Sequence, residues 1–175
     1  MNKTSIFMLL IGVLFLTQSC ENRKNNLTDL EKKLIINSAK VTVQKVFESS
    51  NNFEFINGLN YYSGDSDAYY TSNGAILTLA DLKKSYNQIG SSVEILENKI
   101  DGWNSTFLSQ NTVAFTLPIS LKIKLKNIPE YNGKLVWSAV VQKRNNKWLI
   151  IQSHESWLNC LEVFQALTPL EKIGQ

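Results

Sequence analysis

The clearest pattern in the chain is a strict alternation of apolar and polar residues over residues 111–126. The apolar positions are Val113, Phe115, Leu117, Ile119, Leu121, Ile123 and Leu125. Because successive side chains of a β-strand point to opposite faces, this period of two predicts a long strand with one buried face. Pro118 lies inside the run and favours an edge position or a bulge, because proline has no amide hydrogen to donate.

Other patterns predict three helices and more strands around this long strand. Thr28 and Glu31 form a capping box that opens the first helix, and Asn73-Gly74 is typical of a tight β-hairpin. The predicted helices cover 28–49, 53–62 (a short helix or turn) and 81–89, and the predicted strands cover 67–72, 75–79, 93–103, 111–126, 135–142 and 148–157. This order indicates an α+β fold, with helices on one face of a curved antiparallel sheet.

The N-terminus has the three regions of a secretory signal. A positive charge at Lys3 precedes an apolar run over residues 6–16, and Ser19-Cys20 is followed at once by polar residues. This ending resembles the lipobox of bacterial lipoproteins, with Leu16, Ser19 and Cys20 as the matching residues. We therefore expect a lipoprotein signal peptide over 1–19, a tether over 20–27 and a chain acylated at Cys20. An ordinary signal peptide with a chance cysteine is the alternative.

Composition excludes several classes of protein. The chain is 43% hydrophobic and 19% charged, which is usual for a globular domain, and its net charge of +3 is no signature of nucleic-acid binding. One histidine and two cysteines cannot supply a zinc site with the usual ligands. We expect no cofactor and no nucleic acid. The expected partners are a membrane through lipidated Cys20 and a small-molecule ligand, in a bacterial cell envelope, facing the periplasm or the exterior.

The last predicted strand, residues 146–156, resembles the closing strand of SnoaL-like domains in the nuclear transport factor 2-like superfamily. It has an aromatic residue, an aliphatic residue, alternating polar positions and a final serine, and the order of elements over about 28–157 fits as well. The resemblance implies a cone-like, strongly bent antiparallel sheet wrapped around N-terminal helices, with a pocket at its open end. Residues 158–175 would form a C-terminal tail.

Alternation predicts which residues of this strand face the pocket. Trp148, Ile150, Gln152, His154 and Ser156 share one face, which the resemblance turns inward, and Glu155 and Trp157 share the other. We expect a ligand to contact one group of residues: Tyr61, Tyr70, Trp137, Trp148, Gln152, His154 and Ser156.

Three functions remain open at this stage. The first is binding of a small apolar or amphipathic molecule. The second is an acid/base enzyme of isomerase or dehydratase type, with His154 as the catalytic residue. Its candidate acids are Asp65, Asp67 and Glu97, of which the two aspartates are more simply a solvated turn. The third is a protein-interaction module that forms a homodimer through its sheet.

Overall fold

The computed structural model describes residues 27–72 and 74–158. The chain divides into two compact units, residues 1–30 and 31–175, and the features below belong to the second unit, apart from the start of the first helix at residues 29–30. The predicted signal peptide, Cys20, and nearly all of the predicted tether and tail lie outside the described residues. Within the described ranges, no helix combines the length and the hydropathy that crossing a membrane would require.

The predicted helices are present. They are α2 (Asp29–Asn51), α3 (Phe55–Gly58), the 3-10 turn η2 (Leu59–Tyr61) and α4 (Leu79–Gly90). Helix α4 starts two residues earlier than expected because Thr78 caps it. The Thr78 hydroxyl accepts from the Asp81 amide at 3.2 Å, while the Asp81 carboxylate accepts from the Thr78 amide at 2.9 Å. This reciprocal pair satisfies amide groups that a helix start otherwise leaves without partners.

The seven strands form one mixed sheet. They are β1 (Tyr69–Ser72), β2 (Ala75–Leu77), β3 (Val93–Ile100), β4 (Asn104–Ser109), β5 (Thr112–Leu125), β6 (Tyr131–Arg144) and β7 (Lys147–Trp157). The order is β2-β1-β7-β6-β5-β3, and β4 also pairs with β5. The expected α+β class and curved sheet are confirmed. One pairing departs from the expected antiparallel arrangement, because β1 pairs with β7 in parallel.

Strand β5 confirms the predicted alternation and explains its proline. From Val113 to Leu121 the apolar side chains are buried, whereas the residues between them are more exposed. Pro118 lies opposite Val136 of β6. On the other edge of β5, one segment pairs with β3 and another pairs with β4, and Pro118 lies between these two segments. Proline therefore occupies a point where β5 has no strand partner on that side, so its missing amide interrupts no ladder there.

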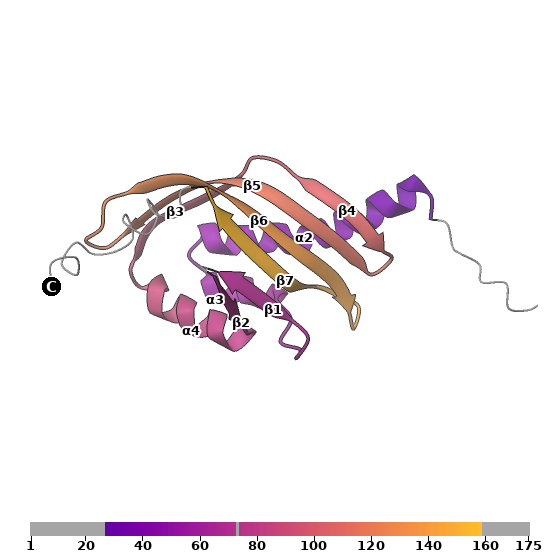
Figure 1. Cartoon of the computed structure of the whole chain (residues 1–175), viewed down its shortest axis with the longest axis horizontal. Helices are drawn as coiled ribbons and strands as arrows, with labels where there is room; N and C mark the ends of the chain where they lie inside the picture. The colour runs from indigo at the N-terminus through magenta and orange to yellow at the C-terminus, as the bar shows by residue number, and fades with distance from the viewer. Residues whose placement is uncertain (1–26, 73, 159–175) are drawn as a thin grey trace, which may run out of the picture. The chain divides into compact units, whose positions relative to one another are not determined.

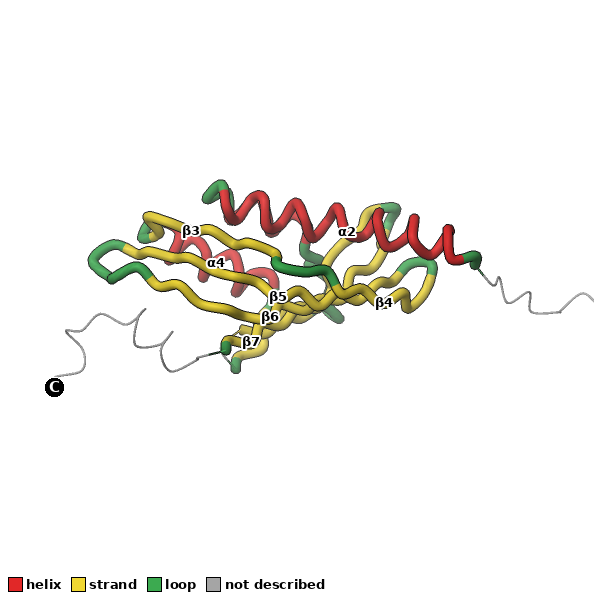
Figure 2. The backbone as a smooth tube through the Cα atoms, turned by 90° about the horizontal axis from the view of Figure 1, so that it is seen from above, coloured by secondary structure: helices red, strands yellow, loops and turns green. Residues whose placement is uncertain are grey.

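The core lies between helix α2 and the concave side of the sheet. Ala39 and Val43 of α2 are fully buried against β5, β6 and β7, and Phe47 packs edge-on against Trp137 with ring centroids 5.4 Å apart. Figure 1 shows helices α2, α3 and α4 on the concave side of the long strands. Figure 2, seen from above, shows α2 running along the sheet and α4 beneath β3 and β5.

Candidate functional site

A β-bulge in β7 decides which residues of this strand face inward. Gln152 pairs with Val140 and Ile150 pairs with Val141, so Ile151 is an extra residue with no counterpart on β6. Trp148 and Ile150 face inward before the bulge, as predicted. After it the alternation shifts by one residue, so Ser153 is buried, Glu155 is half-buried and His154 is exposed. A single bulged residue reverses the faces of everything that follows it.

This shift places Ser153, Glu155 and Trp157 in the wall of a cavity of about 460 Å³. Helix α4 forms one wall and the concave side of the sheet forms another, with the β1–β2 hairpin and α3 alongside. Most of the wall is hydrocarbon, and its larger apolar side chains include Leu82, Leu96, Leu121, Ile123, Leu135 and Trp137. A cavity of this size with a few polar groups is typical of a small-molecule site.

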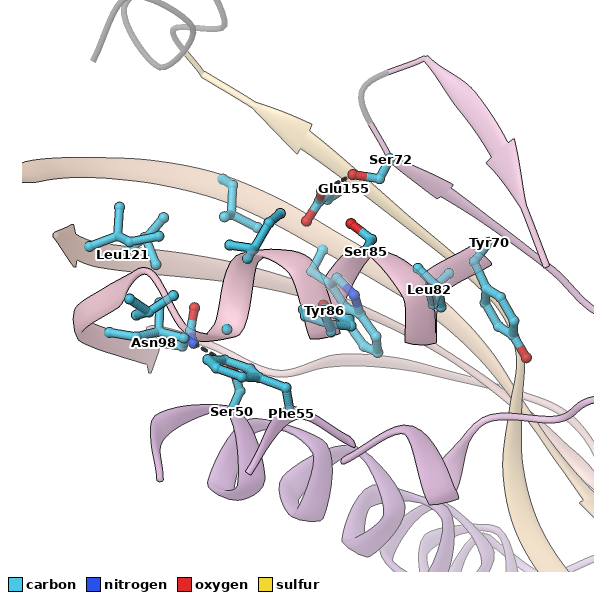
Figure 3. A pocket seen from close by; sticks show the side chains of 18 of the residues that line it. Ser50, Phe55, Tyr70, Ser72, Leu82, Ser85, Tyr86, Asn98, Leu121 and Glu155 are labelled. Atoms are coloured by element: carbon cyan, nitrogen blue, oxygen red, sulfur yellow. Dashed lines mark hydrogen bonds between the residues drawn. The ribbon is translucent and has the colours of Figure 1, made fainter. Parts of the chain in front are cut away.

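The polar groups of the cavity gather around Glu155. Its carboxylate accepts a hydrogen bond from the hydroxyl of Ser72, which fixes the Glu155 side chain of β7 against the neighbouring strand β1. Figure 3 shows Glu155 of β7 beside Ser72 of β1, with Ser85 and Tyr86 on helix α4. Across the cavity Asn98 donates to the Ser50 hydroxyl at 3.2 Å. Glu155 is the one aspartate or glutamate among the described residues of this wall, and its inward position follows from the bulge.

Two tyrosine hydroxyls share the environment of Glu155. Burial, reinforced by the charges of Tyr86 and Glu155, raises the pKa of Tyr62 well above its ordinary value. Burial, with a smaller contribution from Glu155, raises the pKa of Tyr86 to about 12, although 38% of that residue is exposed. Both hydroxyls stay protonated at neutral pH and remain able to donate.

The structure brings some of the predicted ligand contacts to the cavity and not others. Trp137 and Tyr70 line it, but the Tyr70 hydroxyl donates to the backbone oxygens of Ser63 and Ile150, at 2.6 and 3.0 Å, and points away from Glu155 in Figure 3. Burial raises the pKa of Tyr70 to about 12. The ring of Tyr70 is therefore part of the cavity wall, and its hydroxyl anchors the loop before β1.

The remaining predicted contacts lie elsewhere. Tyr61 borders a separate polar hollow beside α2, and Trp148 packs against the core without reaching the cavity. The expected inward orientation of Gln152, His154 and Ser156 is wrong, because all three follow the bulge and turn to the outer face, where His154 and Ser156 are exposed. Whether any of these residues binds a ligand stays a prediction.

The candidate acids also lie outside the cavity wall. Glu97 is exposed, 3.7 Å from Lys122. Asp65 and Asp67 both bind Arg144. Its Nη1 lies 2.7 Å from an oxygen of Asp65, and its Nη2 lies 2.7 Å from an oxygen of Asp67. Hydrogen bonds from Arg144 hold the pKa of each aspartate below its ordinary value. The turn before β1 is thereby fastened to the end of β6, which is a structural role.

We expect Arg144→Gln to lower the free energy of unfolding at pH 7 and to lose this effect in acid. The folded-state pKa values of Asp65 and Asp67 are depressed, so their contribution is present above the unfolded value near about pH 4 and is lost as the pH falls through the folded values. The effect is small, because both carboxylates are more than half exposed. Urea unfolding at pH 7 and pH 3 measures it.

Lys99→Gln is the matched control for this test. It removes the same charge from a side chain that is 81% exposed and 3.8 Å from its partner Asp101. The loss of unfolding free energy in Arg144→Gln should be larger at pH 7 than at pH 3. If it is equal at both pH values, or no larger than the loss in Lys99→Gln, the structural role assigned to Arg144 is wrong.

Comparison with known proteins gives matches of structure alone. No protein-family model matches the sequence, and no match to a curated protein is significant. Within the described residues, no group of three or more His, Cys, Asp or Glu side chains is arranged to hold a metal ion.

Solved structures are similar at low sequence identity. A candidate scytalone dehydratase from Novosphingobium aromaticivorans has a TM-score of 0.67 and 10% identity, over 74% of this chain and 88% of that one. A hexachlorocyclohexane dehydrochlorinase from Novosphingobium barchaimii has a TM-score of 0.64 and 11% identity, over 75% and 91%. An NTF-2 like protein of unknown function from Shewanella oneidensis has a TM-score of 0.53 and 22% identity, over 69% and 98%. The chain therefore has the nuclear transport factor 2-like fold.

Proposed function

We propose that this domain binds a small apolar or amphipathic molecule in the cavity beside α4. The observation that carries the proposal is a cavity of about 460 Å³ with a largely hydrocarbon wall and polar groups confined to a few positions. Burying an apolar ligand there contributes roughly 25 cal/mol for each Å² removed from water. The few polar groups then fix the orientation of the ligand.

We further propose that the chain is held at a membrane through acylated Cys20 and faces the periplasm or the exterior. The apolar run of residues 6–16 and the abrupt change to polar residues after Cys20 support this. Homodimerisation through the outer face of the sheet stays a prediction. That face carries Val136, which is 44% exposed.

Acid/base catalysis is the second candidate, and the observation that favours it is the position of Glu155. A carboxylate beside two protonated tyrosines can accept a proton while a hydroxyl donates to a developing negative charge. His154 was the residue expected in this role, but it lies on the outer face. Turnover of a bound ligand that stops in Glu155→Gln, with binding retained, would favour this candidate over binding alone.

We expect Leu96→Trp to weaken binding of a neutral fluorescent probe, N-phenylnaphthylamine. Leu96 lines the cavity from β3, so the larger side chain takes up volume that the probe needs. The probe should bind at least about tenfold more weakly, which corresponds to roughly 1.4 kcal/mol. Titration of the full chain carrying Cys20→Ser, so that no acyl chain competes for the probe, measures this through the probe's own emission.

The control is Val136→Trp, which adds the same indole to the exposed outer face. It should bind the probe as the parent does. Thermal melting of both variants shows whether they are folded, because overpacking costs roughly 1–3 kcal/mol. Equal probe affinity in a folded Leu96→Trp protein and in the parent would place the binding site elsewhere and overturn the proposal.

A further inference from the structure

The charge of the cavity wall has one sign. Among the described residues that line it, Glu155 is the one carboxylic acid, and none is a lysine, arginine or histidine. Within the described chain, the carboxylate takes a hydrogen bond from the neutral Ser72 hydroxyl and is in no ion pair. A half-buried carboxylate with no opposite charge costs free energy, and a cation brought into the cavity would offset that cost.

Aromatic side chains line the same cavity as this carboxylate. Phe55 and Tyr86 are stacked, with centroids 5.7 Å apart and planes 4° from parallel, and the other aromatic residues of the wall are Tyr62, Tyr70, Trp137 and Trp157. The faces of such rings carry negative potential and attract cations, most strongly where water is excluded. The same rings give an apolar body a large contact area.

The two tyrosine hydroxyls add no further charge of either sign. Burial and the neighbouring negative charge keep both phenols protonated, so they can donate to neutral acceptors but cannot neutralise Glu155. An anionic ligand would therefore meet Glu155 without a compensating cation in the described wall. This arrangement disfavours fatty acids and other carboxylates, because like charges at short range repel strongly in a site of low dielectric.

We propose that the ligand of this cavity is an organic cation, a protonated amine or quaternary ammonium group on an apolar body. The nitrogen lies beside Glu155, and the body lies against the aromatic wall and the leucines of β3, β5 and α4. This inference rests on the proposed function and adds the charge of the ligand to it. An ammonium group would also donate charge-assisted hydrogen bonds to the carboxylate, which are about twice as strong as neutral ones.

Three probes with the same ring system test the sign of the charge: naphthylethylamine, naphthylethanol and naphthylacetate. They are titrated by calorimetry into the full chain carrying Cys20→Ser at pH 7 and low salt. We expect the amine to bind about tenfold more tightly than the alcohol, and the acetate to bind more weakly than both. In Glu155→Gln, the alcohol should bind as before and the preference for the amine should fall to nearly one.

Glu97→Gln is the matched control. It removes the same charge from β3, outside the cavity wall, and should keep the full preference for the amine. Binding of the alcohol to Glu155→Gln shows that the variant retains an intact cavity. If the acetate binds as tightly as the amine, or if Glu155→Gln keeps the preference, the cation assignment is wrong while ligand binding stands. If none of the three binds, the cation assignment and the proposed ligand binding fail together.

Discussion

Replacing Cys20 with serine should move the protein from the membrane fraction to the soluble fraction. Serine cannot form the thioether through which a lipoprotein cysteine carries its lipid. Each buried methylene contributes about 0.8 kcal/mol, and one acyl chain gives only marginal attachment, so stable anchoring needs several chains on this cysteine. The described residues contain no helix long and apolar enough to cross a membrane. Fractionation after a high-salt wash measures the change.

Cys160→Ser is the control, because it removes the other cysteine of the chain and should leave the protein in the membrane fraction. The salt wash removes protein held only by surface charge, which is screened within a Debye length of about 3 Å at 1 M salt. A Cys20→Ser protein that still sediments with washed membranes would rule out the lipid anchor.

Phe115→Ala should destabilise the domain by roughly 3–5 kcal/mol. Phe115 is 2% exposed in the middle of β5, and its ring packs edge-on against Trp103 with centroids 6.0 Å apart. Truncation leaves a cavity between α2 and the sheet, because the rigid strands on both sides cannot close over it. Since whole domains are stable by only about 5–15 kcal/mol, the loss is large, and urea unfolding or thermal melting measures it.

Thr116→Ala is the comparison within the same strand. Thr116 is exposed on the outer face, one position from Phe115, so its truncation should cost less than about 1 kcal/mol. Equal losses for the two variants would show that β5 does not bury alternate residues.

Much of the fold could be predicted from the sequence because the strongest sequence patterns depend on neighbouring residues alone. The alternation of β5 is long enough that no helix could bury the same residues, and the structure confirms it. The hairpin around Asn73-Gly74 is also confirmed by the pairing of Ser72 with Ala75, and Gly74 has the positive φ of 79° that tight hairpin turns favour. Strand β4 was missed because its residues Asn104–Ser109 are mostly exposed and show no apolar face.

The pocket could not be derived in the same way, because it depends on pairings between distant segments. The parallel contact of β1 with β7 joins residues about 80 positions apart and brings Ser72 to Glu155. The bulge at Ile151 left one signal in the sequence. Leu149, Ile150 and Ile151 are three consecutive aliphatic residues that break the alternation, and Trp157 then resumes it with the opposite parity. An alternation that continues unchanged through these three residues assigns Glu155 to the outer face, although its side chain lines the cavity.

The bulge at Ile151 determines which residues of β7 line the cavity, and so which chemical groups a ligand meets there. With Ile151 present, the inward set after the bulge is Ser153, Glu155 and Trp157. If Ile151 were paired regularly instead of bulged, Gln152, His154 and Ser156 would take these places, and an imidazole would replace the carboxylate without any substitution. Keeping or losing this bulge can therefore change which compounds the fold accepts, while the core formed by Trp148 and Ile150 stays as it is.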